Sequence, residues 1–364
     1  MIERLINRLF KHIDGFLMGS VALTLLLGLF VLYSASGGNP ARMMAQLTNI
    51  SVALVVMWVA ANIPPQHLER VALPLYLLGL VLLAGVAMFG EITNGARRWL
   101  DLGVARIQPS ELMKIAVPMM LAWYFAKREA TLQLVDYIIA AIFLAVPAAF
   151  ILKQPDLGTT LLIVGSGIFV IYLAGFSWKL ILGLSATFAA LAPVLWGLLH
   201  DYQRRRIIIL FDPHQDPLGA GYHTIQASIA IGSGGLAGKG WLNGTQSQLD
   251  FIPERTTDFI LAVFGEEFGL LGNLFLLLLF TLIIGRGMLI AAQAQNTFCR
   301  LLAGSITLTF FTYAFVNIGM VSGILPVVGV PLPLISYGGT SLVTLMLGFG
   351  ILMSIQTHKK LVAT

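Results

Sequence analysis

Charged residues and cysteines are scarce in this 364-residue chain. Only 11% of its residues are charged, against about a quarter in soluble proteins, and 57% are apolar. The single cysteine excludes an internal disulfide, a zinc cluster and a CxxC redox motif. The sequence also lacks an internal repeat, metal-ligand spacing, a Ser-His-Asp pattern and a nucleotide fingerprint. With no segment the size of a cytoplasmic domain, a nucleotide-consuming transporter or a nucleotide-sugar transferase is disfavoured.

Long apolar runs fill most of the sequence. A helix needs about 20 apolar residues to cross the ~30 Å hydrocarbon core of a bilayer. We therefore predict one all-α, polytopic integral membrane domain over residues 1–364, with about ten transmembrane helices. The predicted spans are Gly15–Tyr33, Leu47–Ile63, Val71–Phe89, Glu111–Phe125, Tyr137–Leu152, Thr159–Phe176, Leu180–Leu199, Phe259–Ile284, Leu301–Val321 and Gly339–Ile355.

Basic residues in short loops predict the orientation, because such loops stay cytoplasmic. One face carries most of them: Arg4, Arg8, Lys11, Arg70, Lys127, Arg128, Lys179, Arg286, Arg300, Lys359 and Lys360. An even number of spans places both termini on this face. We therefore predict cytoplasmic termini and, between spans seven and eight, a large extracytoplasmic loop over about residues 201–258. The net charge of +5 comes from basic residues scattered among the loops, which form no continuous basic face. Nucleic-acid binding is therefore disfavoured.

The predicted outer loops also contain basic residues, which the simple charge rule does not explain. They are Arg97, Arg98, Arg106, Lys153, Arg204, Arg205, Arg206, Lys239 and Arg255. These side chains either anchor to anionic lipid head groups or bind an anionic substrate such as a phosphate ester, since guanidinium groups suit phosphate oxygens.

Three polar residues near the starts of two predicted spans have two readings each. Glu111 and Lys114 lie three residues apart on one side of a helix, so they form either a local ion pair or part of an anion site at the outer mouth. Asp156 is placed to cap the following helix. Alternatively, Asp156 pairs with Lys114 inside the bundle.

Asp258 stands where the longest polar segment meets a long apolar one. Charged groups at a bilayer are costly and tend to mark reactive sites or paths. We therefore predict that Asp258 is a catalytic base acting on a lipid-linked substrate. Glu266 and Glu267 follow about 12 Å further along the helix at 1.5 Å per residue. They point to different faces, so at least one should face a polar bundle interior.

Two irregular segments flank this region. Gly232–Gly240 is not a P-loop, and it is either a flexible connector or a backbone that approaches a phosphate. Ser322–Gly339 contains three prolines and cannot be a regular helix. Irregular backbone survives at membrane depth only where protein or a cavity surrounds it. We therefore expect Ser322–Gly339 to be a re-entrant loop lining the outer mouth.

Seven motifs occur in order along the chain. They are Gly95–Leu100 (GARRWL), Gln108–Glu111 (QPSE), Gln154–Gly158 (QPDLG), Asp212–Gly221 (DPHQDPLGAG), Phe251–Arg255 (FIPER) with Thr257–Phe259, Gly265–Glu267 (GEE) and Pro331–Gly339 (PLPLISYGG). Over nearly its whole length the chain resembles the SEDS family (shape, elongation, division and sporulation). The short N-terminus and the FIPER motif resemble the rod-shape members more than the division members.

The resemblance implies a glycosyltransferase of the bacterial inner membrane that polymerises lipid II into β-1,4 glycan strands during elongation. It implies a class B penicillin-binding protein (a transpeptidase) and other elongation-complex membrane proteins as partners. It also implies that Asp258 is catalytic and that Glu111, Lys114 and Asp156 belong to the outer cavity. We expect further substrate contacts from Arg97, Arg98, Arg204, Arg255 and Ser336. The sequence identifies no certain cofactor, and the acids Asp258, Glu254 and Asp250 leave open a divalent cation, Mg²⁺ or Mn²⁺.

Two other functions compete with a polymerase. Lys114, Glu266 and Asn317 inside the bundle are compatible with the translocation path of a lipid II flippase. A flippase, however, would not need its critical acid at the outer surface, and many transporters show internal symmetry. A non-catalytic scaffold of the elongation machinery is the third function, and it requires no chemistry at Asp258.

Overall fold

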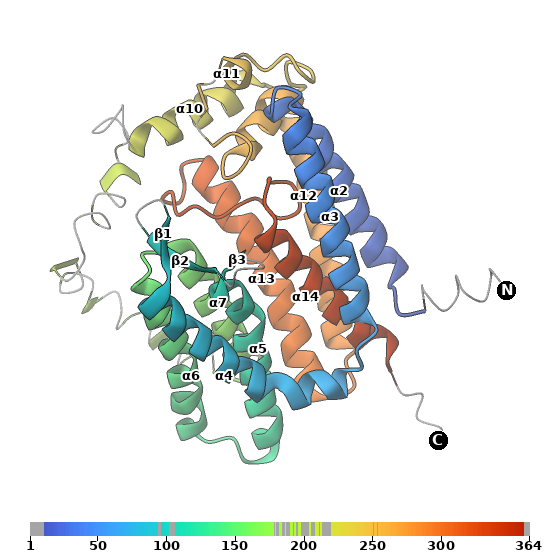
Figure 1. Ribbon diagram of the computed structural model, residues 1–364, viewed down its shortest axis with the longest axis vertical. Helices are drawn as coiled ribbons and strands as arrows, with labels where there is room; N and C mark the ends of the chain where they lie inside the picture. Colours follow the sequence, from blue (N-terminus) through green and yellow to red (C-terminus); the bar gives the residue numbers. More distant parts are fainter. Residues whose placement is uncertain are drawn as a thin grey trace.

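The computed structural model describes residues 11–93, 96–101, 106–177, 220–249, 251–252 and 254–359, with scattered positions between 179 and 212. Long helices form a bundle, with a small sheet at one side (Figure 1). The helices are α2 (Gly15–Ala35), α3 (Pro40–Ala61), α4 (Pro65–Phe89), α5 (Pro109–Arg128), α6 (Leu134–Leu152), α7 (Leu157–Leu173), α10 (Ala220–Ser233), α11 (Thr245–Gln248), α12 (Ile260–Ala292), α13 (Thr297–Val321) and α14 (Thr340–Thr357). Strands β1 (Glu91–Thr93), β2 (Ala96–Asp101) and β3 (Arg106–Ile107) pair antiparallel in the order β1-β2-β3.

Seven of the described helices are long and apolar enough to cross a membrane, namely α2, α3, α4, α6, α12, α13 and α14. The chain is therefore a multi-pass membrane protein. Helices α5 and α7 coincide with two further predicted spans. The predicted span Leu180–Leu199 lies largely outside the described residues, so the total of ten stays a prediction.

Helix starts follow from local chemistry. Asp14 and Asn296 cap α2 and α13, because their side chains accept hydrogen bonds from the backbone N–H groups of Leu17 (2.9 Å) and Cys299 (2.8 Å). Helices α3, α4 and α5 each begin with proline, whose fixed φ suits the first turn and whose missing N–H has no partner there anyway.

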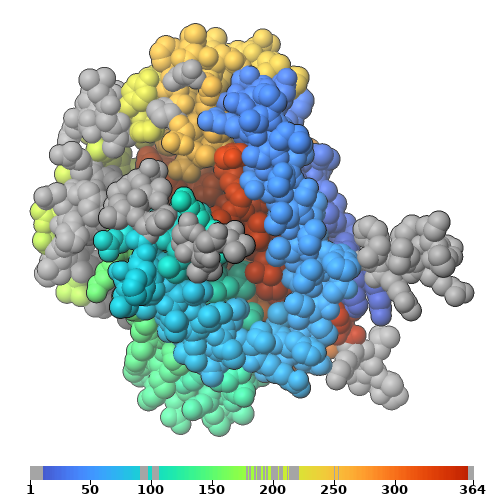
Figure 2. Space-filling model, in the orientation of Figure 1, coloured from blue at the N-terminus to red at the C-terminus, as the bar shows by residue number. Residues whose placement is uncertain are grey.

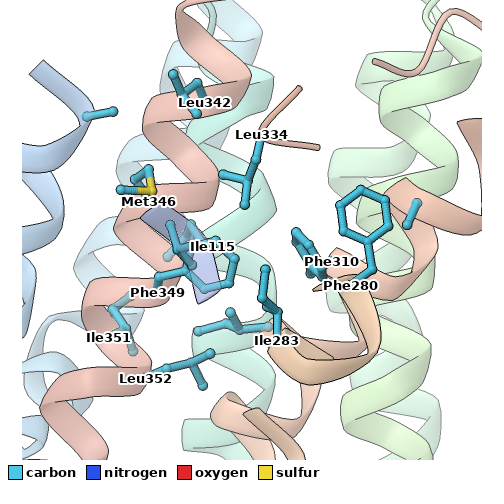
Figure 3. Packing of buried hydrophobic residues seen from close by; sticks show 14 of the residues in the cluster. Ile115, Phe280, Ile283, Phe310, Leu334, Leu342, Met346, Phe349, Ile351 and Leu352 are labelled. Atoms are coloured by element: carbon cyan, nitrogen blue, oxygen red, sulfur yellow. The ribbon is translucent and has the colours of Figure 1, made fainter. Parts of the chain in front are cut away.

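Helix α13 lies at the centre of the bundle. Inside its most apolar window 67% of residues are buried, against 22% for α3. Phe310 of α13 packs against Phe280 of α12 and Phe349 of α14, with ring centroids 5.5 and 5.4 Å apart (Figure 3). Side chains from α13 can therefore reach several other helices.

The two ends of the bundle differ. His12 stacks on His358 with ring centroids 4.0 Å apart, so the two described chain ends meet at one end, called here the terminus end. The turn before α12, the end of α13 and the start of α14 lie at the opposite end, called here the loop end (Figure 1).

The segment Gly232–Gly240 packs tightly on α12, so the flexible connector predicted for it is wrong. The N–H groups of Lys239 and Gly240 donate to the carbonyls of Glu266 and Glu267, both at 3.0 Å. These two N–H groups are therefore already hydrogen-bonded within the protein. The alternative prediction, that the backbone here approaches a phosphate, has no support. Glycine is required because a Cβ at Gly238 would lie only 2.1 Å from the Glu267 carbonyl oxygen. Helix α12 kinks at this contact, where Gly269 has φ 64° and ψ −158°.

Candidate active site

Asp258 closes a tight turn directly before α12. The turn begins at Glu254, whose backbone carbonyl accepts hydrogen bonds from the N–H groups of Thr257 (3.0 Å) and Phe259 (3.2 Å). The Asp258 carbonyl accepts from Asn317 Nδ2 at 2.8 Å, and the same Nδ2 donates to the Val330 carbonyl at 2.7 Å. Asn317 of α13 thus fixes both the turn and the proline-rich segment.

The Asp258 carboxyl lies against the backbone of Gly329. Gly329 has φ +73°, and a Cβ there would stand 3.4 Å from Asp258 Oδ2. Burial, together with the negative charge of Glu254, raises the pKa of Asp258 to about 6. An acid with this pKa exchanges a proton near neutral pH, as the predicted base requires.

The segment Ser322–Gly339 is irregular, as its prolines predict, and it packs on the Asp258 turn. Ser336 Oγ donates to the Thr257 carbonyl at 2.6 Å and accepts from the Leu332 N–H at 2.8 Å. The Tyr337 N–H donates to the Thr256 carbonyl at 2.8 Å. Ser336 therefore lies next to Asp258, where it supports the backbone of the turn.

Lys114 is buried in α5 with two partners. Its Nζ lies 2.6 Å from Glu111 Oε1 and 2.6 Å from Tyr313 Oη. The local ion pair expected between Glu111 and Lys114 is confirmed. Tyr313 stands one helical turn before Asn317 on α13, so one face of α13 holds both Lys114 and the Asp258 turn. The predicted base, Asp258, and the Lys114 ammonium therefore share one wall.

Arg98 and Asp156 meet at the start of α7. Arg98 Nε lies 3.7 Å from Asp156 Oδ2, and Arg98 also donates to the Pro155 carbonyl at 2.9 Å. Asp156 caps α7 through the Thr159 N–H at 3.1 Å, so its predicted cap is confirmed. The direct Lys114–Asp156 pair is wrong, because the ionic partner of Asp156 comes from β2.

The three other arginines with predicted substrate contacts lie in different settings. Arg97 is exposed on β2. Arg204 donates to the carbonyls of Trp196 (3.0 Å) and Gly197 (2.7 Å) in its own segment. Arg255 donates to the carbonyl of Ser247. These contacts tie Arg204 and Arg255 to backbone, and their predicted role toward substrate stays a prediction.

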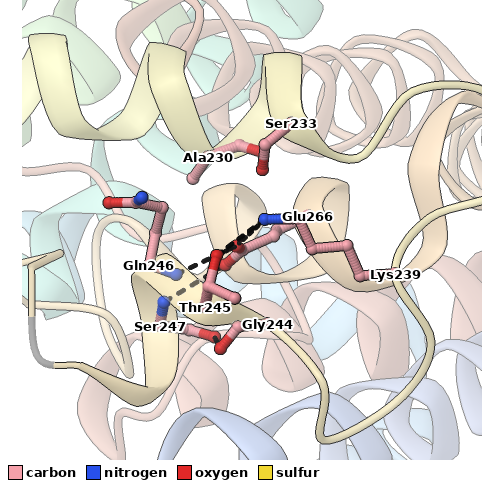
Figure 4. A network of polar contacts seen from close by, with 8 residues as sticks. All are labelled: Ala230, Ser233, Lys239, Gly244, Thr245, Gln246, Ser247 and Glu266. Atoms are coloured by element: carbon pink, nitrogen blue, oxygen red, sulfur yellow. Dashed lines mark hydrogen bonds and ion pairs between the residues drawn. The ribbon is translucent and has the colours of Figure 1, made fainter.

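Glu266 and Glu267 are both buried and point to different sides of α12. Glu266 accepts from Lys239 Nζ (2.8 Å) and from the N–H groups of Gln246 (2.9 Å) and Ser247 (3.1 Å) (Figure 4). Glu267 accepts from the hydroxyl of Ser34 on α2. Glu266 therefore holds the segment with Lys239, Gln246 and Ser247 against α12, and Glu267 holds α2 against α12. The sequence pattern alone does not predict these contacts.

A mostly apolar groove of about 510 Å³ runs beside Glu111. It is lined by Asn49, Val52, Leu82, Arg106, Ile107, Gln108, Pro109, Glu111, Leu112, Gly339, Thr340, Val343, Thr344 and Leu347. In Figure 2 the red surface of α14 is visible recessed between the blue α3 and the cyan α4. The groove thus connects the lipid-facing side of the bundle with the Glu111–Lys114 pair.

Several buried polar atoms around this region have no hydrogen-bond partner within the described chain: Ser110 Oγ, Glu111 Oε2, Gln154 Nε2, His223 Nδ1 and Asn317 Oδ1. Such atoms are rare in folded proteins and tend to collect at functional sites. Among the described residues no three His, Cys, Asp or Glu side chains are placed to hold a metal ion. Asp250, one of the acids considered for a cation, lies outside the described residues.

Sequence reasoning missed three residues of the site. Tyr313 holds Lys114, Gly329 lies against Asp258, and His223 is half-buried and stacks on Phe259 with ring centroids 5.5 Å apart. A tyrosine one turn before an asparagine in an apolar span is a signal that could have found Tyr313. Gly329 and His223 carry no such local signal.

Comparisons with known proteins agree with this geometry. A family model for FtsW, RodA and SpoVE, described as cell cycle protein, matches residues 15–361. The chain is 53% identical over 353 residues to the Escherichia coli protein named peptidoglycan glycosyltransferase MrdB, covering 97% of this chain and 95% of that one. It is 38% identical over 310 residues to a probable peptidoglycan glycosyltransferase FtsW of Geobacter metallireducens, covering 84% and 82%.

Two solved structures have the same fold. A chain in a structure titled for the coordination of polymerization and crosslinking by a peptidoglycan synthase complex matches with TM-score 0.83 and 32% identity, covering 95% of this chain and 99% of that one. The rod shape determining protein RodA of Thermus thermophilus matches with TM-score 0.73 and 27% identity, covering 95% and 98%. The chain therefore belongs to the FtsW/RodA/SpoVE family, the SEDS family that its seven motifs indicate.

Proposed function

We propose that this chain is a peptidoglycan glycosyltransferase that polymerises lipid II into β-1,4 glycan strands during cell elongation. The names of its relatives support this reaction class. The observation that carries the proposal is Asp258, a half-buried acid with a pKa raised to about 6 on the wall that also holds Lys114. A general base works best when its pKa lies near the operating pH.

In the proposed reaction, a hydroxyl of the incoming lipid II attacks the anomeric carbon of a growing strand held as its polyprenyl diphosphate. The Asp258 carboxylate accepts the hydroxyl proton as the new C–O bond forms. The bond to the diphosphate breaks, and its electron pair leaves with the diphosphate. Attack from the face opposite the leaving group converts the α-linked donor into a β linkage. The diphosphate ester supplies the driving energy, so no nucleotide takes part.

Lys114 is the proposed cation for the departing diphosphate. An ammonium group has three N–H donors, and Glu111 and Tyr313 take two of them. The third can donate to a diphosphate oxygen, and a fixed cation at developing charge lowers the barrier. Arg98, held beside Asp156, is a second candidate for this contact. The apolar groove beside Glu111 suits the polyprenyl chain.

We also propose that the loop end faces outward, with ten spans and both termini in the cytoplasm. The stacking of His12 on His358 at one end supports this orientation, as do Arg70, Lys127 and Arg286 near the helix ends there. Residues 201–258 would then form the large extracytoplasmic loop. A class B penicillin-binding protein is the proposed partner, supported by similarity to a chain from a peptidoglycan synthase complex.

The test is glycan formation from purified lipid II in detergent by the chain with its partner. Wild type is compared with Asp258→Asn in an equally well assembled complex. We expect polymer from wild type and at least hundredfold less from the variant, since general bases contribute about 10²–10⁴-fold. Equal polymer from both would remove Asp258 from the chemistry and put the flippase or scaffold function first.

A further inference from the structure

A second pocket, of about 620 Å³, lies between α4 and α5 at the terminus end. Its lining consists of Gln66, Glu69, Arg70, Leu73, Pro74, Trp123 and Lys127. The α4 residues recur at spacings of three and four, so they share one helix face, and the two α5 residues are one turn apart. The hydroxyl of Ser354 in α14 donates to the Ile63 carbonyl just before α4, which places the start of α4 at the terminus end.

Polarity changes along the pocket. Arg70 and Lys127 lie near the helix ends, whereas Leu73 and Trp123 lie further along the two helices, away from the terminus end. Lys127 Nζ stands 4.9 Å from the centroid of the Trp123 ring. Tryptophan and long basic side chains commonly mark the level of lipid head groups. The lining therefore offers a charged mouth and an apolar wall, as an amphiphile requires.

Among the described residues, Arg70 and Lys127 differ from three nearby arginines in having no carboxylate at salt-bridge distance. Three other arginines at the terminus end pair with acids: Arg128 with Asp136, Arg286 with Asp14 and Arg300 with Glu129. Within the described chain, neither Arg70 nor Lys127 has a carboxylate at salt-bridge distance. A site for an anion needs cations that are not already neutralised, and these two qualify.

Glu69 is the only acid among the described residues that line the pocket. Glu69 is half-buried and lies close enough to Cys299 of α13 for the two groups to interact electrostatically. With Arg70 and Lys127 positive and Glu69 negative, one net positive charge remains. This matches the single negative charge of one phosphodiester and disfavours a zwitterionic head group, whose net charge is zero.

We propose that this pocket binds one anionic phospholipid, with its phosphate between Arg70 and Lys127 and an acyl chain along Leu73 and Trp123. A planar guanidinium suits two phosphate oxygens at once, and the ammonium adds a point charge. The site lies on α5, whose other end carries Glu111 and Lys114. The lipid would brace α4 against α5, the helix that carries Lys114. The proposal does not rest on the glycosyltransferase reaction.

The experiment measures binding of phosphatidylglycerol to the full-length chain in detergent by native mass spectrometry, with phosphatidylcholine of the same acyl chains as the reference. The test variant is Arg70→Gln with Lys127→Gln. The matched control is Lys11→Gln with Lys359→Gln, which removes the same charge at the same end outside the pocket. Inorganic phosphate is added as a competitor in a separate arm, and thermal unfolding checks that all proteins are folded.

We expect phosphatidylglycerol to bind more tightly than phosphatidylcholine, and the test variant to lose about 25-fold in affinity, because each of the two cations contributes about fivefold. The control should stay within about twofold of wild type. Equal loss in test and control would reduce the effect to general charge and overturn the site. Equal binding of the two lipids, or displacement by millimolar phosphate, would overturn it as well.

Discussion

Asp258 and Glu266 are acids at the same end of α12 with opposite surroundings. Glu266 is fully buried, and Lys239 and two backbone N–H groups donate to its carboxylate. Within the described part of the chain no donor reaches the Asp258 carboxylate, whose close neighbour is the Gly329 backbone. A carboxylate whose acceptor positions are filled fixes structure, whereas a half-buried one without donors holds its proton more tightly and stays open to substrate.

The largest difference should appear when Asp258 is replaced by asparagine. The polymerisation rate should fall at least about hundredfold, whereas the melting temperature should not fall. The folded-state pKa of about 6 lies above the ordinary 3.8, so ionisation of Asp258 costs the folded state stability as pH rises between these values. At pH 7 an uncharged asparagine removes that cost. Thermal unfolding in detergent checks this, and a clear drop in melting temperature would make Asp258 a structural acid.

Lys114→Met should give the next largest loss. Removing a fixed cation at a departing diphosphate is expected to lower the rate at saturating lipid II by about 10²–10³-fold. Arg42→Met, which removes an exposed cation near the start of α3, is the matched control and should change the rate less than about twofold. Equal effects of the two variants would count against a role for Lys114 in the cavity.

Glu266→Leu should affect folding rather than chemistry. It leaves the Lys239 ammonium and two N–H groups without their acceptor, which should cost about 3 kcal/mol of unfolding free energy. The control is Glu129→Leu, which breaks an exposed ion pair with Arg300 and should cost about 1 kcal/mol or less. Thermal unfolding of both variants in one detergent gives the comparison, and similar shifts would contradict the structural role of Glu266.

The sequence predicted the helical membrane fold, the irregular proline-rich segment, the Glu111–Lys114 ion pair and the Asp156 cap, and the structure confirms these. The roles of these residues and of Asp258 toward substrate stay predictions. The confirmed features carry local signals: long apolar runs, prolines, and charges at the ends of apolar runs. The sequence could not predict Tyr313, the second partner of Lys114. Tyr313 contacts Lys114 only because α13 and α5 pack together. The local sequence of neither helix predicts which distant helix it will pack against.

The glycine-rich segment shows the same limit. Glycines predict either freedom of the backbone or close approach to another group, and the sequence does not say which. Here the close neighbour is α12 itself at Gly269, so the glycines produce a tight contact instead of mobility. The arrangement around Glu266 depends on this contact, because it brings Lys239 onto α12.

Glu254→Gln should move the pH dependence of the reaction without removing activity. The charge of Glu254 contributes to the raised pKa of Asp258, so its loss should lower that pKa. A general base must be deprotonated, so the rising limb of rate against pH, expected near pH 6 in wild type, should shift to lower pH. Rates measured between pH 4.5 and 8 test this, with Glu129→Gln as the control; a shift to higher pH would exclude Asp258 as the titrating group.

Ser336→Ala should give the smallest effect and refine the contrast between reactive and supporting groups. Its hydroxyl donates to the Thr257 carbonyl and accepts from the Leu332 N–H, so its loss leaves both backbone groups without a partner. This should cost about 1 kcal/mol of unfolding free energy. The rate should fall only a few-fold, because the turn that carries Asp258 keeps its bond to Asn317. Ser51→Ala, which removes one local bond on an exposed helix face, is the control. A loss as large as that of Asp258→Asn would mean that Ser336 contacts the substrate itself.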